Sequence, residues 1–169
     1  RRGVVVMNTP DVNTISAAEH TVAIMLTLSR NIAVGDSGMK QGAWDRHVLV
    51  GSELRNKTLG IVGMGKIGRE VMTRCRSFGM NILGYDPYMS QDMFNPEEVK
   101  TVDLDELTAN SDYITVHVPL TDSTRNLFDY ERLSAMKSSA RIVNVARGGI
   151  INEMDLAQAL TDGKIAGAA

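Results

Sequence analysis

Short runs of apolar residues alternate along this chain with stretches in which apolar residues recur at helical spacing. The apolar runs are rich in Val and Ile, which is typical of strands covered on both faces of a sheet. They predict strands at 3–8, 58–63, 81–86, 113–118 and 140–146, with a further strand beginning at 164.

The stretches between these runs predict helices. The longest covers 16–40, and Ser16 and Glu19 have the spacing of a capping box at its start. At 66–78 apolar residues recur every three or four positions, and Gly79 follows as a stop signal. The apolar positions of that stretch are Ile67, Val71, Cys75 and Phe78. Shorter helices are expected at 103–111 and 152–163.

This alternation of strands and helices decides the fold class. Strands separated by helices need crossover connections, which give a parallel sheet with helices on both faces. We therefore predict an α/β fold, a Rossmann-type doubly wound parallel sheet, in a single domain of 169 residues. The least regular segments are expected at 87–100 and 119–130.

The composition narrows the class of function. Hydrophobic residues make up 43% and charged residues 22% of the chain, as in ordinary globular domains. The net charge of −2 at pH 7 gives no reason to expect nucleic acid or an anionic membrane as a partner. The apolar run at 22–28 is too short to span a membrane.

Cysteine and histidine usage bears on compartment and metals. Cys75 is the single cysteine and cannot form an internal disulfide, which favours a reducing compartment, and we expect the cytoplasm. One cysteine and three scattered histidines form no zinc signature, so we predict no metal site.

The stretch LGIVGMGKIGREV at 59–71 carries the strongest candidate chemistry. Gly63, Gly65 and Gly68 have the G-x-G-x-x-G spacing between a predicted strand and a predicted helix. In that setting the first glycine permits a tight turn, the second lets the backbone approach a diphosphate, and the third lets helix and strand pack closely. The helix N-terminus then offers N–H groups to the phosphates. The alternative is that these glycines serve only the turn.

Asp86 ends the next predicted strand. A carboxylate there would accept hydrogen bonds from the adenosine ribose hydroxyls and repel a 2′-phosphate, which favours NAD over NADP. The alternative is a solvated acid at the end of a strand.

Arg147 follows the predicted strand 140–146 and precedes two glycines. Because the carboxyl ends of parallel strands face the ligand crevice, we expect Arg147 beside the nicotinamide half of the cofactor. A guanidinium there can bind a carboxylate bidentately and polarise a neighbouring carbonyl. The alternative is a surface arginine that pairs with Glu153.

The segment VHVPLTDSTRN at 116–126 is the third candidate. Pro119 directs the chain away from the sheet after the strand, which leaves His117 and Val118 near the adenosine side of the crevice. We interpret His117 as a packed side chain rather than a catalytic one.

These motifs together resemble those of the D-isomer-specific 2-hydroxyacid dehydrogenases over essentially the whole chain. The matching stretches are GVVVMNTP, ISAAEHTVAIML, MKQGAWDR, SELRNKTLGIVGMGKIGREV, GYDP, ITVHVPLTDSTRNL, RIVNVARGGIINE and DGKIAGAA. The resemblance implies that residues 1–169 are the NAD-binding domain, truncated at both ends and without the substrate-binding domain.

The resemblance also implies roles for individual residues. Arg147 matches the catalytic arginine of the family, and Asn13 matches a position near the substrate side of the cleft. The expected NAD-binding residues are Gly63, Gly65, Lys66, Ile67, Gly68, Asp86, Val118, Pro119, Val145, Ala146 and Arg147.

The family's mechanism further needs a glutamate and a histidine that lie beyond Ala169. Glu153 is not a substitute, because it belongs to the matched GGIINE motif. We therefore expect this chain to bind NAD or NADH without turning over substrate, and NADH production by it would contradict that expectation.

The implied reaction is hydride transfer between a 2-hydroxy or 2-oxo acid and NAD. The motifs are most similar to those of members that act on 3-phospho-D-glycerate, although Val118 stands where such members often carry threonine. The alternatives are a member acting on glyoxylate, hydroxypyruvate or lactate, an NAD-sensing module like the corepressors that share this fold, and a purely structural role.

The resemblance implies a homodimer or higher homo-oligomer formed through the helix predicted at 16–40. The run of apolar residues at 22–26 is wider than one helix face within a subunit needs. The alternative is that this helix is buried within the monomer.

Overall fold

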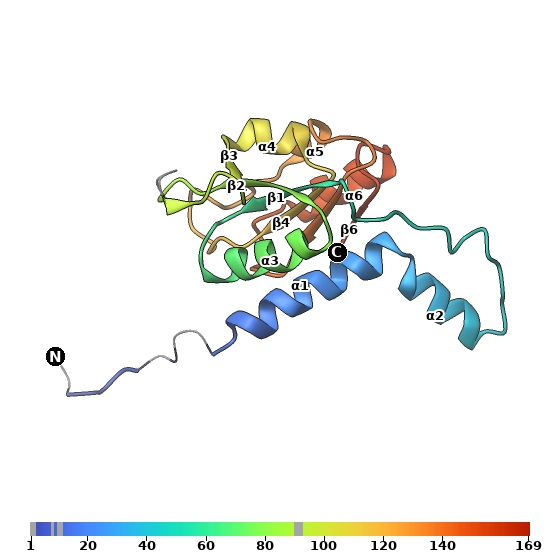
Figure 1. Cartoon of the computed structure of the whole chain (residues 1–169), viewed down its shortest axis with the longest axis horizontal. Coiled ribbons are helices and arrows are strands. Elements are labelled where there is room, and N and C mark those ends of the chain that lie inside the picture. The colour runs from blue at the N-terminus through green and yellow to red at the C-terminus, as the bar shows by residue number, and fades with distance from the viewer. Residues whose placement is uncertain (1–2, 8, 10–11, 90–92) are drawn as a thin grey trace.

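The computed structural model of the chain describes residues 3–7, 9, 12–89 and 93–169, and within them six parallel strands form one sheet (Figure 1). The strand order is β3-β2-β1-β4-β5-β6. The strands are β1 (Thr58–Val62), β2 (Asn81–Tyr85), β3 (Lys100–Thr101), β4 (Tyr113–Val116), β5 (Arg141–Asn144) and β6 (Gly167–Ala168). This is the predicted doubly wound topology, with the strand order reversing between β1 and β4.

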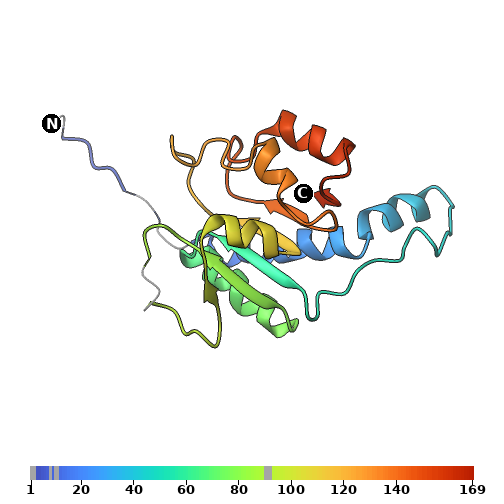
Figure 2. The same ribbon diagram turned by 90° about the horizontal axis from the view of Figure 1, so that it is seen from above.

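Helices cover both faces of the sheet (Figures 1 and 2). They are α1 (Thr14–Ser29), α2 (Ile32–Lys40), α3 (Lys66–Ser77), α4 (Leu104–Asn110), α5 (Tyr130–Ser134) and α6 (Glu153–Thr161). Alternate residues of β4 reach the two layers: Tyr113 is buried in the core with α1 and α3, and Ile114 in the core with α4, α5 and α6. Both faces of the sheet are therefore apolar, as the continuous strand patterns predict.

The helix predicted at 16–40 is wrong in its bounds and in its cap. The helix is interrupted at Asn31, which has a φ of +54°. The side-chain amide of Asn31 donates to the carbonyls of Val48 and Val50 at 3.1 and 3.2 Å. Asparagine tolerates this left-handed conformation, and the two hydrogen bonds hold the break against the returning loop. At the other end α1 begins at Thr14, and the Ser16 hydroxyl donates to the Asn13 carbonyl instead of forming a capping box.

The segment 3–8 does not form the predicted strand over its described residues. Residues 3–7 have no regular secondary structure and are exposed, and Asn8 lies outside the described residues. A strand needs a neighbour for its backbone hydrogen bonds, and none of the described strands pairs with this segment. Phe78 is also not part of the buried face of α3, because it is 41% exposed.

Two short elements were not predicted from the pattern. β3 has two residues, too few to show a period. α5 lies in the segment expected to be irregular, yet its N-cap Asp129 accepts from the Arg132 amide at 2.9 Å. An aspartate at an N-cap was the signal that could have placed this helix.

Candidate functional site

The turn between β1 and α3 has no room for a side chain at two of its glycines. Gly63 has a φ of +98°, and a Cβ there would lie 2.8 Å from the carbonyl carbon and oxygen of His117. A Cβ at Gly68 would collide with the carbonyl oxygen of Gly63. The fold itself therefore requires these two glycines.

Gly65 is different, because none of the described residues excludes a side chain there. Its φ of −68° and ψ of −164° are open to any residue, and a Cβ would have no protein atom within 4 Å among those described. Gly65 is also the N-cap of α3, where backbone N–H groups have no helical partner. A bare backbone facing open space at a helix N-terminus is the arrangement that a phosphate group needs.

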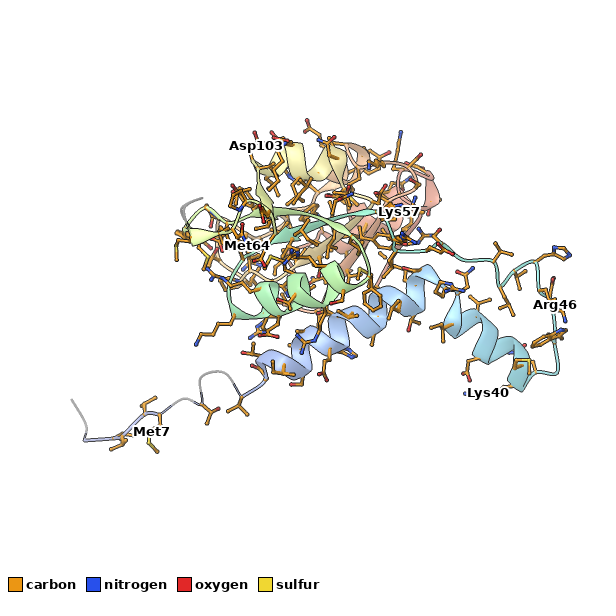
Figure 3. The ribbon with its side chains drawn as sticks, viewed as in Figure 1. Met7, Lys40, Arg46, Lys57, Met64 and Asp103 are labelled. Atoms are coloured by element: carbon orange, nitrogen blue, oxygen red, sulfur yellow. The ribbon has the colours of Figure 1, made fainter. Side chains whose placement is uncertain are left out.

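Asp86 lies directly against this turn, as its place after β2 predicts. One carboxylate oxygen accepts from the Met64 amide at 3.0 Å, and the other accepts from the Tyr88 amide at 2.9 Å. Met64 lies between the sheet and α3 (Figure 3). Each oxygen of Asp86 retains a lone pair, so the carboxylate can still accept hydrogen bonds from a ligand.

A pocket of about 410 Å³ opens beside the glycine turn. It combines a charged end at Asp86 with an apolar wall at Val118, Pro119 and Leu127. Such a pocket suits a flat apolar ring that is attached to a hydroxyl-bearing sugar. Its lining also includes Gly63, Gly65, Tyr85, Pro87, Tyr88, His117, Thr121, Ser123 and Thr124.

A second pocket, of about 220 Å³, lies on the other side of the segment 117–119. It contains the remaining residues that the sequence placed at the crevice, except Lys66 and the buried Gly68. Its lining consists of Asn13, Ala17, Thr21, Ile67, His117, Val118, Pro119, Val145, Ala146 and Arg147. The two pockets share residues 117–119, so they form one crevice along the carboxyl ends of β1, β4 and β5. Lys66 is exposed at the first position of α3.

Arg147 follows β5 and lines the second pocket, and some of its guanidinium N–H groups form no hydrogen bond within the described residues. It is exposed, and one terminal nitrogen donates to the Ala146 carbonyl at 2.7 Å. In the described part of the chain it forms no ion pair with Glu153, so the pairing that the alternative interpretation requires is absent. The other guanidinium N–H groups are free to bind an anion.

Asn144 is a residue of the site that the sequence did not reveal. Its side-chain amide donates to the Arg147 carbonyl at 2.9 Å, and its side-chain oxygen accepts from the Ala146 amide at 3.0 Å. These two bonds shape the turn that carries Arg147. An asparagine at the end of a strand is the local signal for such a turn.

His117 is a packed side chain, as predicted. Its Nε2 lies 3.0 Å from the Thr115 hydroxyl, and Thr115 is fully buried. Burial lowers the pKa of His117 to about 4. The ring is therefore neutral near pH 7 and adds no positive charge to the crevice.

Other candidate sites in the described part of the chain offer fewer unpaired polar groups for binding a ligand. A larger pocket of about 550 Å³ lies between α4 and α5, but Arg132 and Asp105 on its wall are already paired at 2.6 Å. The described residues hold no cluster of three or more His, Cys, Asp or Glu side chains that could bind a metal ion. Over the same residues, none of the helices has the length and hydropathy to cross a membrane.

Comparison with protein families and with curated relatives agrees with this geometry. The sequence model of the D-isomer specific 2-hydroxyacid dehydrogenase NAD-binding domain matches residues 22–169. D-3-phosphoglycerate dehydrogenase of Methanocaldococcus jannaschii is 47% identical over 169 residues, covering 99% of this chain and 32% of that protein. The human enzyme of the same name is 46% identical and covers 100% of this chain and 32% of its own length. The chain thus spans about a third of these relatives.

Solved structures show the same fold. Salmonella D-lactate dehydrogenase superposes with a TM-score of 0.89 at 32% identity, covering 98% of this chain and 50% of that one. The NAD-dependent formate dehydrogenase of Staphylococcus aureus in complex with NAD superposes with a TM-score of 0.86 at 40% identity, covering 92% of this chain and 47% of that one.

Proposed function

Because this chain belongs to the D-isomer specific 2-hydroxyacid dehydrogenases, as their NAD-binding domain, we propose that it serves an oxidoreductase that oxidises a 2-hydroxy acid. The substrate proposed is 3-phospho-D-glycerate, in line with the names of relatives that are 46–47% identical. In that reaction C2 of the acid would give a hydride to NAD and its hydroxyl group would give a proton to a general base, which leaves the 2-oxo acid.

The observation that carries the cofactor assignment is that Gly65 and Asp86 line the same pocket. Gly65 leaves room that no atom of the described residues occupies, and the Asp86 carboxylate is held against the same turn by the Met64 amide. We assign the diphosphate to this turn and the adenosine ribose to Asp86, whose negative charge disfavours a 2′-phosphate. The residues assigned to the diphosphate are Gly63, Gly65, Lys66, Ile67 and Gly68.

The crevice orders the rest of the cofactor. Val118 and Pro119 form the apolar wall of the pocket beside Asp86, where we place the adenine. Val145, Ala146 and Arg147 line the second pocket, where we place the nicotinamide. When bound, NAD supplies the hydride acceptor, and the protein supplies orientation and charge.

Arg147 is the proposed catalytic residue of this chain. Its guanidinium can hold the substrate carboxylate bidentately and polarise the oxygen on C2, because only one of its terminal nitrogens is engaged with the Ala146 carbonyl. His117 is not assigned the proton of the substrate hydroxyl, since its Nε2 is bound to the Thr115 hydroxyl. Asn13 lines the same pocket and is proposed to lie on the substrate side.

An assay of the enzyme that carries this domain tests the function. We expect NADH formation from 3-phospho-D-glycerate, and Arg147→Lys should lower kcat/KM by about 30-fold because lysine keeps the charge but loses bidentate binding, worth about 2 kcal/mol. Arg76→Lys, on the exposed side of α3, is the matched control and should leave kcat/KM unchanged. Activity confined to D-lactate or glyoxylate would overturn the substrate, and full activity of Arg147→Lys would overturn the role of that residue.

We also propose a homodimer, formed through an arm that consists of α2 and residues 41–50. The buried side of α1 explains part of the apolar run at 22–26, because Val22 and Met25 pack inside the monomer. Among the described residues none buries α2 of the arm, which extends away from the sheet with Lys40 and Arg46 near its far end (Figure 3). Its exposed apolar residues are Ile32, Val34, Met39, Trp44, Val48 and Val50.

Light scattering tests the dimer. We expect the mass of two chains for the unmodified protein and of one chain for Trp44→Glu. The dimer interface would bury the new carboxylate without a positive charge to pair with it, which disfavours association. Ala157→Glu, on the exposed side of α6, should remain dimeric. A monomeric unmodified protein would contradict the proposal.

A further inference from the structure

Arg69, in the first turns of α3, joins the glycine turn to the loop that follows Asp86. Its Nε donates to the Met64 carbonyl at 3.1 Å, and a terminal nitrogen donates to the Met89 sulfur at 3.6 Å. Its guanidinium carbon lies 4.9 Å from the centre of the Phe94 ring, within the range of a cation–π contact. The side chain is partly buried, so these contacts are sheltered from water.

The bond to Met64 completes the hydrogen bonding of one residue inside the glycine turn. The Met64 amide donates to Asp86 at 3.0 Å, while its carbonyl accepts from Arg69, and its side chain is fully buried. Two charged side chains, one from the end of β2 and one from α3, therefore hold the backbone of Met64 from opposite directions.

Holding the Met64 carbonyl also sets the direction of the next amide. The Met64 carbonyl and the Gly65 N–H belong to one planar trans peptide group, in which C=O and N–H point in opposite directions. Because the carbonyl faces Arg69, the N–H of Gly65 faces away from it. Within the described residues that N–H donates to no protein group.

We propose that Arg69 is a positioning residue for the diphosphate of the cofactor. It does not touch the ligand, but it orients the Gly65 N–H toward the crevice and keeps that donor from turning into the protein. This inference rests on the proposed function, because it takes NAD as the ligand of the glycine turn.

The test compares ligands with and without the diphosphate on Arg69 variants of this chain. Arg69→Met removes the donors and the charge, whereas Arg69→Lys keeps the charge but loses the planar fork that reaches Met64 and Met89 together. We expect the Kd for NADH to rise about tenfold with Met and about fivefold with Lys, and the Kd for adenosine to change by less than about twofold. Arg76→Met, which loses only a surface pair with Glu98, is the control and should bind both ligands as the unmodified chain does.

A measurement on the free protein makes the test independent of binding. In NMR spectra without ligand, the Gly65 amide signal should shift in both Arg69 variants and stay in place in Arg76→Met. Equal losses for NADH and adenosine, unchanged NADH binding, or an unmoved Gly65 signal would overturn the inference. Failure of the unmodified chain to bind NADH would instead overturn the proposed function, and that result is distinct because it needs no variant.

Discussion

Replacing Gly65 by alanine is expected to weaken NADH binding by at least about 100-fold while leaving the stability of the chain unchanged. The added methyl group meets no atom within 4 Å in the part of the chain that the structure describes, and the backbone conformation of Gly65 is one that alanine adopts readily. The methyl group would occupy the space assigned to the diphosphate. Losing about two charge-assisted hydrogen bonds there costs about 3 kcal/mol of binding, which is the stated factor.

Calorimetric titration with NADH, together with urea unfolding of the free protein, measures both halves of this prediction. The free energy of unfolding should match that of the unmodified chain within about 0.5 kcal/mol. If Gly65→Ala binds NADH normally, the diphosphate does not lie against this turn. If Gly65→Ala has a lower free energy of unfolding than the unmodified chain, the added methyl group collides with the protein and the space beside Gly65 is not open.

Replacing Gly68 by alanine should, in contrast to Gly65→Ala, also lower the free energy of unfolding, by about 3 kcal/mol. The new methyl group would collide with the carbonyl oxygen of Gly63, which is backbone and cannot rotate away. Relief requires α3 to move off β1, which also displaces the N-terminus of α3 from the crevice. We therefore expect NADH binding to be lost along with stability.

Gly38→Ala is the matched control, because it is also a glycine inside a helix. A Cβ there would have its nearest neighbour at 3.9 Å, an ordinary contact. Alanine is favoured over glycine in helices by about 1 kcal/mol, so Gly38→Ala should be neutral or stabilising, and only the collision separates the two variants. A Gly68→Ala protein as stable as Gly38→Ala would show that α3 does not pack closely on β1.

Much of the fold and of the candidate site was accessible from the sequence. β1, β2, β4 and β5 lie where continuous apolar runs predict them, because a strand buried on both faces needs such a run. The topology of a doubly wound sheet then brings the ends of these strands to one edge. That is why Asp86 and Arg147, far apart in the chain, line one crevice.

Other features depend on partners that no local pattern announces. The interruption between α1 and α2 at Asn31 depends on carbonyls at positions 48 and 50, so the prediction of a single helix over 16–40 is wrong. Segment 3–7 has the composition of a strand but lacks a neighbour to pair with among the described strands.

By itself, the sequence determined the four central strands, the glycine turn between β1 and α3, and the sign of charge at the two ends of the crevice. These follow from side-chain size and spacing, which are local properties. Only the tertiary structure decided which glycines serve the fold and which one leaves room for a ligand, and that Asp86 and Arg69 hold Met64 between them. The physical reason is that a collision or a hydrogen bond depends on where a second segment lies, and the distance between segments is set by packing of the whole chain.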